Sequence, residues 1–237
     1  MIVKTKSYIY QHGTLGGLMQ DLMEGTEKIG TLSNYGNFGL GTLEGSNGEV
    51  IFLDGIIYHA DETGKINQLS GEELTPYAAV TNFESDVNYF LSNVTDDTVK
   101  NWILDQISHN LFAAVKIEGL FKNMHVRVAP KQEKPYPRFV EIARNQPEFE
   151  AEDITGTIVG FFTPGLFHGA AAAGFHLHFI SDDRKFGGHV LDFQLSEGSV
   201  NLMELAEFRQ HFATENAAYL KNEIKLDEIT KDIEEAE

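Results

Sequence analysis

Three histidines in one short stretch are the residues of this chain whose types and spacing best suit chemistry. His176 and His178 lie in the apolar run GFHLHFI, and His189 follows a glycine pair. Residues two apart on an extended strand project to the same face. The polar stretch between residues 181 and 188 predicts a hairpin that returns His189 beside the other two. Three neutral imidazoles on rigid strands suit zinc or a similar divalent metal and leave a coordination position for water or substrate.

The competing interpretation is structural. A single histidine on a strand face is more often a hydrogen-bonded core residue than a ligand, but two at this spacing with a third across a hairpin favour a metal site. His168, in the preceding loop, is a candidate fourth ligand, although its position before a Gly/Ala run favours a structural role or a place in a pocket wall. The remaining histidines are scattered and predict no site: His12, His59, His109, His125 and His211.

Composition limits the donors available to any metal. The chain has 237 residues, enough for one large domain or two small ones, and 42% of them are hydrophobic. It contains no cysteine, so disulfides and thiolate ligands are excluded and a metal must use nitrogen and oxygen donors. The absence of cysteine also fits a reducing cytoplasm.

Charge and hydropathy exclude other classes of partner. A formal charge of −18 argues against nucleic-acid binding, because a phosphate backbone would be repelled. No stretch approaches the roughly 20 apolar residues of a membrane span, and the N-terminus lacks the apolar block of a signal peptide. We therefore expect a cytoplasmic protein that begins at Met1. To bind an anionic substrate, this acidic chain would need a bound cation and a well-placed arginine that make the local charge positive.

The elements that must position these residues follow from hydrophobic periodicity and turn chemistry. Helices are predicted at 14–23, from Thr95 or Asp96 onwards, and at 138–145. A meander of three strands is predicted at 38–43, 49–53 and 56–59, with a tight turn at Asn47-Gly48 that places Glu49 at its lip. Further strands are expected at 112–121, 124–128 and 153–163, and a more helical, polar chain is expected after Met203.

These elements predict an α+β fold. We expect a mixed β-sheet N-terminal part over residues 1–125 and a smaller, antiparallel, β-barrel-like part over residues 126–237 that carries the metal site, with helices on the outside and an acidic C-terminal tail. The two parts can also form one intertwined unit. The glycine-rich segments match no dinucleotide or phosphate-loop fingerprint.

Several blocks of sequence together resemble one known family. The chain is similar to the α-acetolactate decarboxylases in the blocks YGNFGLGT (35–42), GE (48–49), QEKPY (132–136), GTIVGF (156–161), GFHLHF (174–179) and GGHV (187–190). These blocks extend over nearly the whole chain. The histidine block and the block from Arg127 to Tyr136 are the most specific.

The resemblance implies a zinc enzyme that converts 2-acetolactate to acetoin and CO2, in the acetoin and butanediol branch of pyruvate metabolism. It implies that His176, His178 and His189 bind Zn2+ and that Arg127 and Glu49 act in the pocket. The family's last active-site carboxylate matches Glu237, although Glu234 or Glu235 can take that role in this tail. For Glu49 the second choice is Glu44. The resemblance also makes a homodimer plausible.

The implied chemistry is consistent with these residue types. A 2-hydroxy-3-keto acid loses CO2 readily when the electrons left behind flow into its ketone, and zinc can polarise that ketone and stabilise an enediolate. No organic cofactor is then required. Arg127 can hold the departing carboxylate through its planar donors, and Glu49 or Glu237 can relay the proton that completes the product.

Two other classes of function stay open at this point. A cupin-like metal-dependent dioxygenase or isomerase also carries a His-x-His strand with a later histidine, and it predicts iron or manganese with a carboxylate ligand. A metal-stabilised binding module predicts a closed coordination sphere and no substrate turnover.

Overall fold

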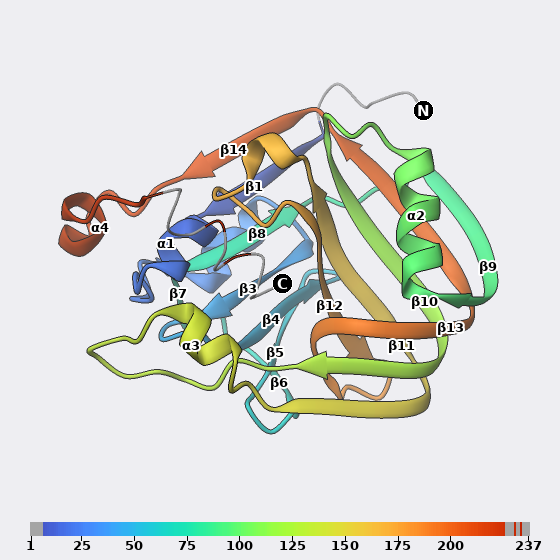
Figure 1. The fold of residues 1–237 in the computed structure, drawn as a ribbon. Helices are drawn as coiled ribbons and strands as arrows, with labels where there is room; N and C mark the ends of the chain where they lie inside the picture. The colour runs from blue at the N-terminus through green and yellow to red at the C-terminus, as the bar shows by residue number, and fades with distance from the viewer. Residues whose placement is uncertain (1–6, 226–229, 231–232, 234–237) are drawn as a thin grey trace.

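The computed structural model describes residues 7–225, 230 and 233 of the chain. Two β-sheets dominate it, and helices are few and short (Figure 1). The fold is therefore the sheet-rich α+β class that the sequence predicts.

The seven-stranded sheet is built mainly from the N-terminal half of the chain. Its strand order is β14-β1-β8-β3-β4-β5-β6, where β1 and β14 are parallel and the other neighbours are antiparallel. The strands span Tyr8–His12 (β1), Phe38–Leu43 (β3), Asn47–Leu53 (β4), Ile56–Ala60 (β5), Ile66–Gln68 (β6), Tyr77–Thr81 (β8) and Glu207–His211 (β14).

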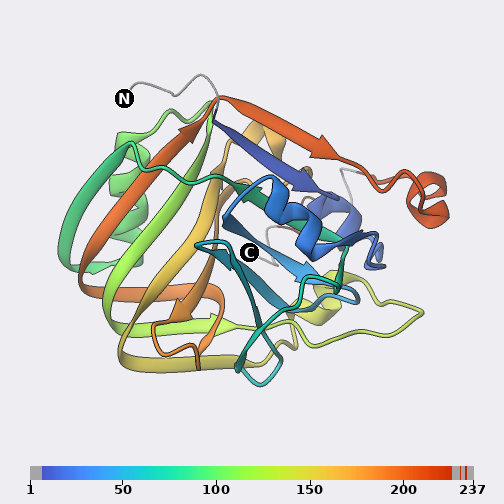
Figure 2. The same ribbon diagram turned by 180° about the vertical axis from the view of Figure 1, so that it is seen from behind.

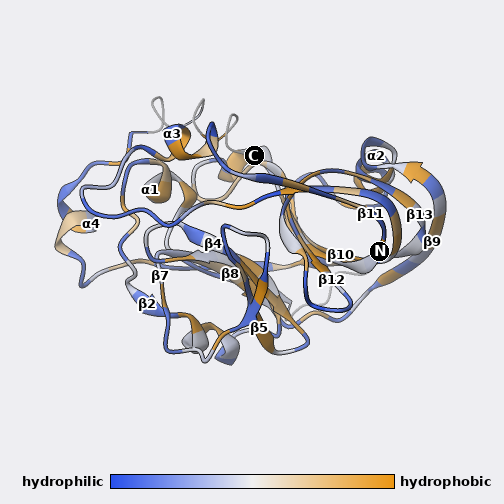
Figure 3. Ribbon diagram, turned by 90° about the horizontal axis from the view of Figure 1, so that it is seen from below, coloured by the Kyte–Doolittle hydropathy of each residue, from blue (hydrophilic) through white to orange (hydrophobic). Residues whose placement is uncertain are grey.

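The second sheet contains the long strands of the molecule. Its order is β10-β11-β12-β13-β9, and β10 also pairs with β13, so β10 to β13 form a closed cycle of antiparallel pairings. Seen from below, these strands curve around one another (Figure 3). They span Val87–Thr95 (β9), Phe112–Arg127 (β10), Glu148–Thr163 (β11), Gly174–Ser181 (β12) and Gly187–Leu205 (β13); a separate short pair is Glu27–Lys28 (β2) with Leu74–Thr75 (β7).

Two of the helices differ in their surroundings. The Thr95 hydroxyl caps α2 (Asp96–Gln106), as predicted, and α2 lies outside the five-stranded sheet with Val99 and Ile103 buried against it. By contrast, all five residues of α1 (Leu15–Met19) are buried, so the expectation that helices lie on the outside is wrong for α1. The others are α3 (Phe139–Ala143), α4 (Ala217–Lys221) and the 3-10 turns η1 (Ile29–Asn34) and η2 (Gly165–Phe167).

Three local predictions need correction. The turn expected at Asn47-Gly48 lies earlier, because β4 already begins at Asn47 and pairs it with Leu43. The two strands expected at 112–121 and 124–128 are one strand, β10, whose pairing with β13 is irregular around Phe121. After Met203 the chain continues as β13 and β14 before α4, so the helical expectation was wrong for residues up to 211.

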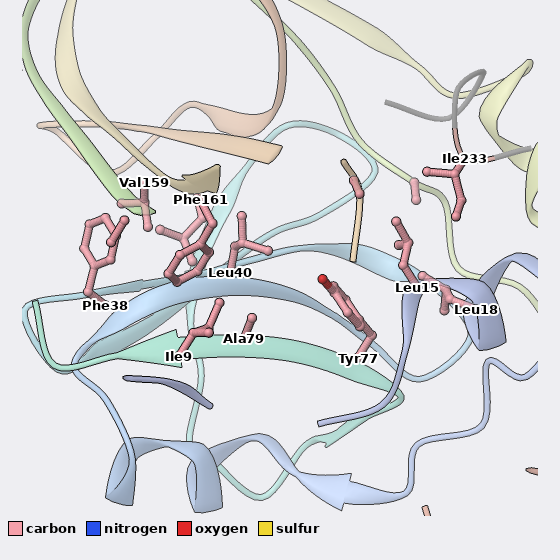
Figure 4. Packing of buried hydrophobic residues seen from close by; sticks show 14 of the residues in the cluster. Ile9, Leu15, Leu18, Phe38, Leu40, Tyr77, Ala79, Val159, Phe161 and Ile233 are labelled. Carbon is pink, nitrogen blue, oxygen red and sulfur yellow. The ribbon is translucent and has the colours of Figure 1, made fainter. Parts of the chain in front are cut away.

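An apolar core joins the two sheets. β3 and β11 face each other, and the rings of Phe38 and Phe161 meet edge to face with centroids 6.2 Å apart. The same cluster continues to α1 and to Ile233, which is 1% exposed and packs near Leu15 and Leu18 (Figure 4). Burial of such side chains is the main stabilising contribution to a fold of this size.

The chain crosses between the sheets more than once. β10 runs through the predicted division at residues 125 and 126, and β14 from the C-terminal half pairs with β1 (Figure 2). The division into two parts and the alternative of one intertwined unit both stay predictions. Among the described residues, no helix is long and apolar enough to cross a membrane.

Candidate metal centre and active site

Three predicted site residues form one row across the five-stranded sheet. In the register of the strands, His178 of β12 is opposite His189 of β13, and His189 is opposite Arg127 of β10. Residues directly opposite each other on antiparallel strands point to the same side of the sheet. His176 joins this side because it lies two residues before His178. The hairpin that the sequence predicts therefore brings the three imidazoles together.

The three imidazoles are close enough to share one ion. The Nε2 atoms of His176 and His178 are 3.2 Å apart, and the His189 ring centroid lies 5.1 Å and 5.6 Å from the other two. Two nitrogens bound to one tetrahedral zinc at about 2.0–2.1 Å are separated by about 3.3 Å. One donor atom from each histidine lies within 4.8 Å of the others. The group has the donors and the spacing of a three-histidine metal centre.

Neighbouring groups orient two of the rings and keep them neutral. The Nδ1 of His178 donates to the carbonyl of Val50 on β4 over 3.0 Å, which leaves Nε2 as the lone-pair nitrogen. Such a second bond fixes the tautomer of a ligand histidine. The ring of His176 stacks on the ring of Tyr77, with centroids 6.5 Å apart. Burial lowers the pKa of His178 to about 4 and that of His176 well below its ordinary value. Neutral imidazoles are the form that binds a metal.

Glu49 approaches this group from the other sheet. Its Oε2 lies 3.3 Å from the Nε2 of His178, and its Oε1 accepts a hydrogen bond from the backbone N–H of Ala129 over 3.1 Å. The N–H of Gly48 donates to the carbonyl of Ala129 over 2.9 Å. These reciprocal bonds fix β4 to the segment that follows Arg127. Glu49 thus lies inside strand β4, where the two sheets meet, and not at the edge of a turn.

Gly48 is needed at this junction for two reasons. Its φ is +65°, a left-handed conformation that L side chains rarely adopt. A Cβ there would also overlap the carbonyl oxygen of Ala60 and the Nε2 of His59. The Gly-Glu pair therefore places the carboxylate through a backbone conformation that only glycine adopts easily.

The carboxyl of Glu49 is in an environment that opposes its charge. It is 8% exposed, and burial raises its pKa to about 7, although the Ala129 hydrogen bond and the positive charge of Arg127 act in the opposite direction. Arg127 is itself buried, at 9% exposed, and its charge also lowers the pKa of His176. One cation thus influences both the carboxylate and an imidazole of the site.

A cavity next to these residues contains polar groups that the sequence did not single out. It is lined by Glu49, Arg127, His176 and His189, by apolar residues of α1 and α3, and by Thr42, Tyr77 and Gln146. Gln146 Oε1 is buried and has no hydrogen-bond partner within the described part of the chain. No periodicity marks these three residues, because each reaches the cavity from a different element; only Thr42 belongs to a block that carries the family resemblance.

Three of the remaining candidates cannot be placed, and two lie outside this group. Glu237, Glu234 and Glu235 are outside the described residues. The second choice for Glu49, Glu44, does not line the cavity, and His168 does not belong to the three-histidine group; its Nδ1 accepts from the N–H of Ala173 over 3.4 Å.

The fold and the site together define a class of protein. Three buried imidazoles, two of them kept neutral by burial, beside a buried carboxylate and a guanidinium at the wall of a largely apolar cavity are typical of an enzyme that uses a divalent metal.

Comparison with known proteins identifies the family. A model of the family "Alpha-acetolactate decarboxylase" matches residues 9–226. The chain is 42% identical to the alpha-acetolactate decarboxylase of Streptococcus thermophilus, over 97% of this chain and 98% of that protein. The chain belongs to the alpha-acetolactate decarboxylase family. It is an enzyme of the carboxy-lyase class, as the sequence predicted.

Solved structures agree with this assignment. The crystal structure of alpha-acetolactate decarboxylase from Bacillus subtilis strain 168 superposes with a TM-score of 0.94 at 33% identity and covers 98% of this chain and 99% of that one. A Staphylococcus aureus protein of unknown function, described as similar to alpha-acetolactate decarboxylase, superposes with a TM-score of 0.95 at 49% identity, over 97% and 100% of the two chains. The similarity therefore extends over the whole fold.

Proposed function

We propose that this chain releases CO2 from 2-acetolactate to form acetoin, with Zn2+ held by His176, His178 and His189. One observation carries the proposal: the facing nitrogens of His176 and His178, 3.2 Å apart, lie beside the carboxylate of Glu49 at the wall of one cavity. Family membership supports the decarboxylation, and the site geometry supports the metal and the residue roles.

The donor set fits zinc. Three imidazole nitrogens, a second hydrogen bond that orients His178, and a carboxylate nearby match a catalytic zinc centre with three protein ligands. Zinc bound there would act as a Lewis acid that polarises the substrate's ketone, so that the electron pair released with CO2 has an acceptor. A thiolate-preferring metal is disfavoured because the chain has no cysteine.

Arg127 is the residue that we assign to the substrate's carboxylate. It is buried beside the histidines and lines the cavity, and it brings positive charge to a chain whose formal charge is −18. Its planar guanidinium can bind a carboxylate through two parallel hydrogen bonds. The residue thereby orients the bond between C1 and C2 for cleavage.

We assign to Glu49 the transfer of the proton that completes the product. Loss of CO2 leaves the electron pair of the broken bond shared between C2 and the former ketone, and acetoin forms when C2 takes up a proton. The Oε2 of Glu49 faces the histidine group and the cavity, so its carboxyl can deliver this proton from a fixed side. Glu237, or Glu234 or Glu235 in its place, remains our proposal for a second carboxylate.

The apolar residues of the cavity wall keep water from this proton transfer. Leu15 and Leu18 of α1 and Phe139 of α3 are among the residues that line the cavity. In a site that excludes water, charged groups interact more strongly than they do in solvent.

The test is a coupled measurement of CO2 and acetoin from 2-acetolactate. We expect turnover by the purified protein, loss of turnover after a zinc chelator, and its return when Zn2+ is added back. His109→Ala is the matched control, because His109 lies on the surface and bonds only to the carbonyl of Leu104 among the contacts described. Full activity in the chelated, metal-free protein would contradict the zinc proposal and leave the family assignment untouched.

A second candidate function is disfavoured. A cupin-like dioxygenase or isomerase would consume oxygen or conserve the carboxylate, and the family assignment supports neither. The finer architectural and cellular predictions stay proposals: the barrel-like character of the part that carries the histidines, the division near residue 125, a homodimer, and a cytoplasmic location.

A further inference from the structure

A second group of side chains with suitable donor atoms for a metal lies at the edge of the seven-stranded sheet formed by β14 and β1. The parallel register of β1 and β14 places His12 directly opposite His211, and Glu27 of β2 lies beside them. Figures 1 and 2 both show β1 and β14 side by side. The sequence predicted no site for either histidine, and the structure brings them together.

The spacing of the donor atoms resembles that of the first group. The Nδ1 atoms of His12 and His211 are 2.9 Å apart, compared with 3.2 Å for the Nε2 atoms of His176 and His178. The two imidazoles and the Glu27 carboxylate each offer a donor atom, all within 4.8 Å of one another. Opening the pair by about 0.4 Å reaches the separation of two nitrogens on one tetrahedral ion.

Neighbouring groups fix the orientation of the His12 ring, as they do for a histidine that binds a metal. It is fully buried, and its Nε2 lies 2.8 Å from the hydroxyl of Thr26. With the proton on Nε2 donated to Thr26, Nδ1 presents its lone pair to His211. Burial lowers the pKa of His12 to about 4, so the ring is neutral. His211 is partly exposed and can move its proton from Nδ1 to Nε2, which leaves both Nδ1 atoms free to bind one cation.

The surroundings of the pair are acidic and accessible. A cavity of about 470 Å3 adjoins His211, and its described lining residues include Glu24, Glu27 and Glu215 and no lysine or arginine. One oxygen of Glu27 accepts from the backbone N–H of Lys28, and the ammonium of Lys28 pairs with Glu72 instead, over 2.6 Å. The negative charge of Glu27 is therefore available to a cation that enters from this cavity.

We propose that His12, His211 and Glu27 form a second divalent-cation site, suited to zinc or another borderline metal such as Ni2+ or Cu2+. Two imidazole nitrogens and one carboxylate oxygen would bind the ion, and water would complete its coordination. The ion would link β1, β2 and β14, joining positions 199 residues apart in the chain. Because the unfolded chain has no such site, binding stabilises the folded state. The proposal is independent of the function of the first group.

The test counts zinc atoms per chain. After equilibrium dialysis against Zn2+, elemental analysis is expected to find one fewer zinc per chain in His211→Ala than in wild type, and one fewer in the milder variant Glu27→Gln. Zinc is also expected to raise the melting temperature of wild type more than that of either variant. His109→Ala, which removes a histidine outside both groups, is the control and is expected to keep the wild-type count.

The counts separate this proposal from the proposed active-site zinc. If wild type binds two zinc ions per chain and the variants bind one, both sites are supported. If wild type binds one and the variants bind none, the second site alone is supported. Equal counts and equal zinc-dependent stabilisation in wild type, His211→Ala and Glu27→Gln would overturn the proposal, leaving the imidazole pair as a hydrogen bond between two strands.

Discussion

The two histidine groups of this molecule are assembled in different ways. The first comes from a hairpin whose ligands lie within fourteen consecutive positions, 176 to 189, and faces an apolar cavity with an arginine and a glutamate. The second joins strands from opposite ends of the described chain and opens toward carboxylates. The first has groups that can bind and protonate a substrate, whereas the second has only groups that can bind a cation. We therefore connect the first with chemistry and the second with stability.

The largest expected effect is a loss in the rate of acetoin formation, and it differs between the two histidine groups. His178→Ala removes a donor from the first group and is expected to lower the rate of acetoin formation by at least about 10³-fold, because the metal loses a ligand. His211→Ala is expected to lower the rate by less than about tenfold. Rates should be measured at the same free zinc concentration and with folding verified by circular dichroism. Comparable losses in the two variants would abolish the functional distinction between the groups.

The next largest effect is a fall in kcat when Glu49 is changed, with Glu27 as the comparison. Glu49→Gln keeps the shape of the side chain but removes its ionisable group, and we expect kcat to fall by about 10²–10⁴-fold. Glu27→Gln, at the second group, is expected to change zinc content more than kcat. Steady-state kinetics with elemental analysis of the same samples measures both quantities. A Glu49→Gln enzyme with wild-type kcat would remove Glu49 from the proton step.

Arg127→Lys tests whether geometry or charge matters beside the first group. Lysine keeps the positive charge but not the planar pair of donors. We expect a loss of about 10–10³-fold in kcat/KM, and weaker inhibition by small carboxylates that mimic the substrate. If the lysine variant binds and turns over substrate as wild type does, the guanidinium acts only through its charge.

A smaller effect concerns the backbone that positions Glu49. Gly48→Ala would introduce a Cβ at a φ of +65° and against Ala60 and His59, so we expect a loss of about 2–5 kcal/mol in the free energy of unfolding. Gly55→Ala is the matched control: its φ is +80°, but nothing lies within 4 Å of the added Cβ. Chemical denaturation should show the smaller loss for Gly55→Ala; equal losses would show that the contact at Gly48 is unimportant.

The smallest expected effect is a pH dependence of stability from His59, a residue of β5 that pairs with Val50 of β4. Burial lowers the pKa of His59, against the opposing effect of its hydrogen bond to Asn47 O. The unfolded chain therefore binds a proton that the folded chain does not, so stability is complete above about pH 6.5 and falls as the pH drops toward the folded pKa. Urea midpoints between about pH 7.5 and 5.5 should fall less for His59→Gln than for wild type; parallel curves would contradict this.

Sequence reasoning found the first group because strand periodicity and one hairpin encode it locally. It also found Arg127 and Glu49, through resemblance, but it placed Glu49 at a turn because the left-handed glycine before it resembles a hairpin residue. The second group left no trace in the sequence, since His12 and His211 meet only through a long-range parallel pairing. Gln146 and Tyr77 were missed for the same reason: their neighbours in the cavity come from other strands and helices.

The pairing of β1 with β14 also sets an order for biosynthesis. β1 is among the earliest strands to leave the ribosome, yet its parallel partner is translated almost at the end of the described chain. Throughout that interval one edge of the nascent sheet has unpaired backbone groups, which are a template for association with other chains. The hairpin histidines, complete at residue 189, are made before that edge is covered.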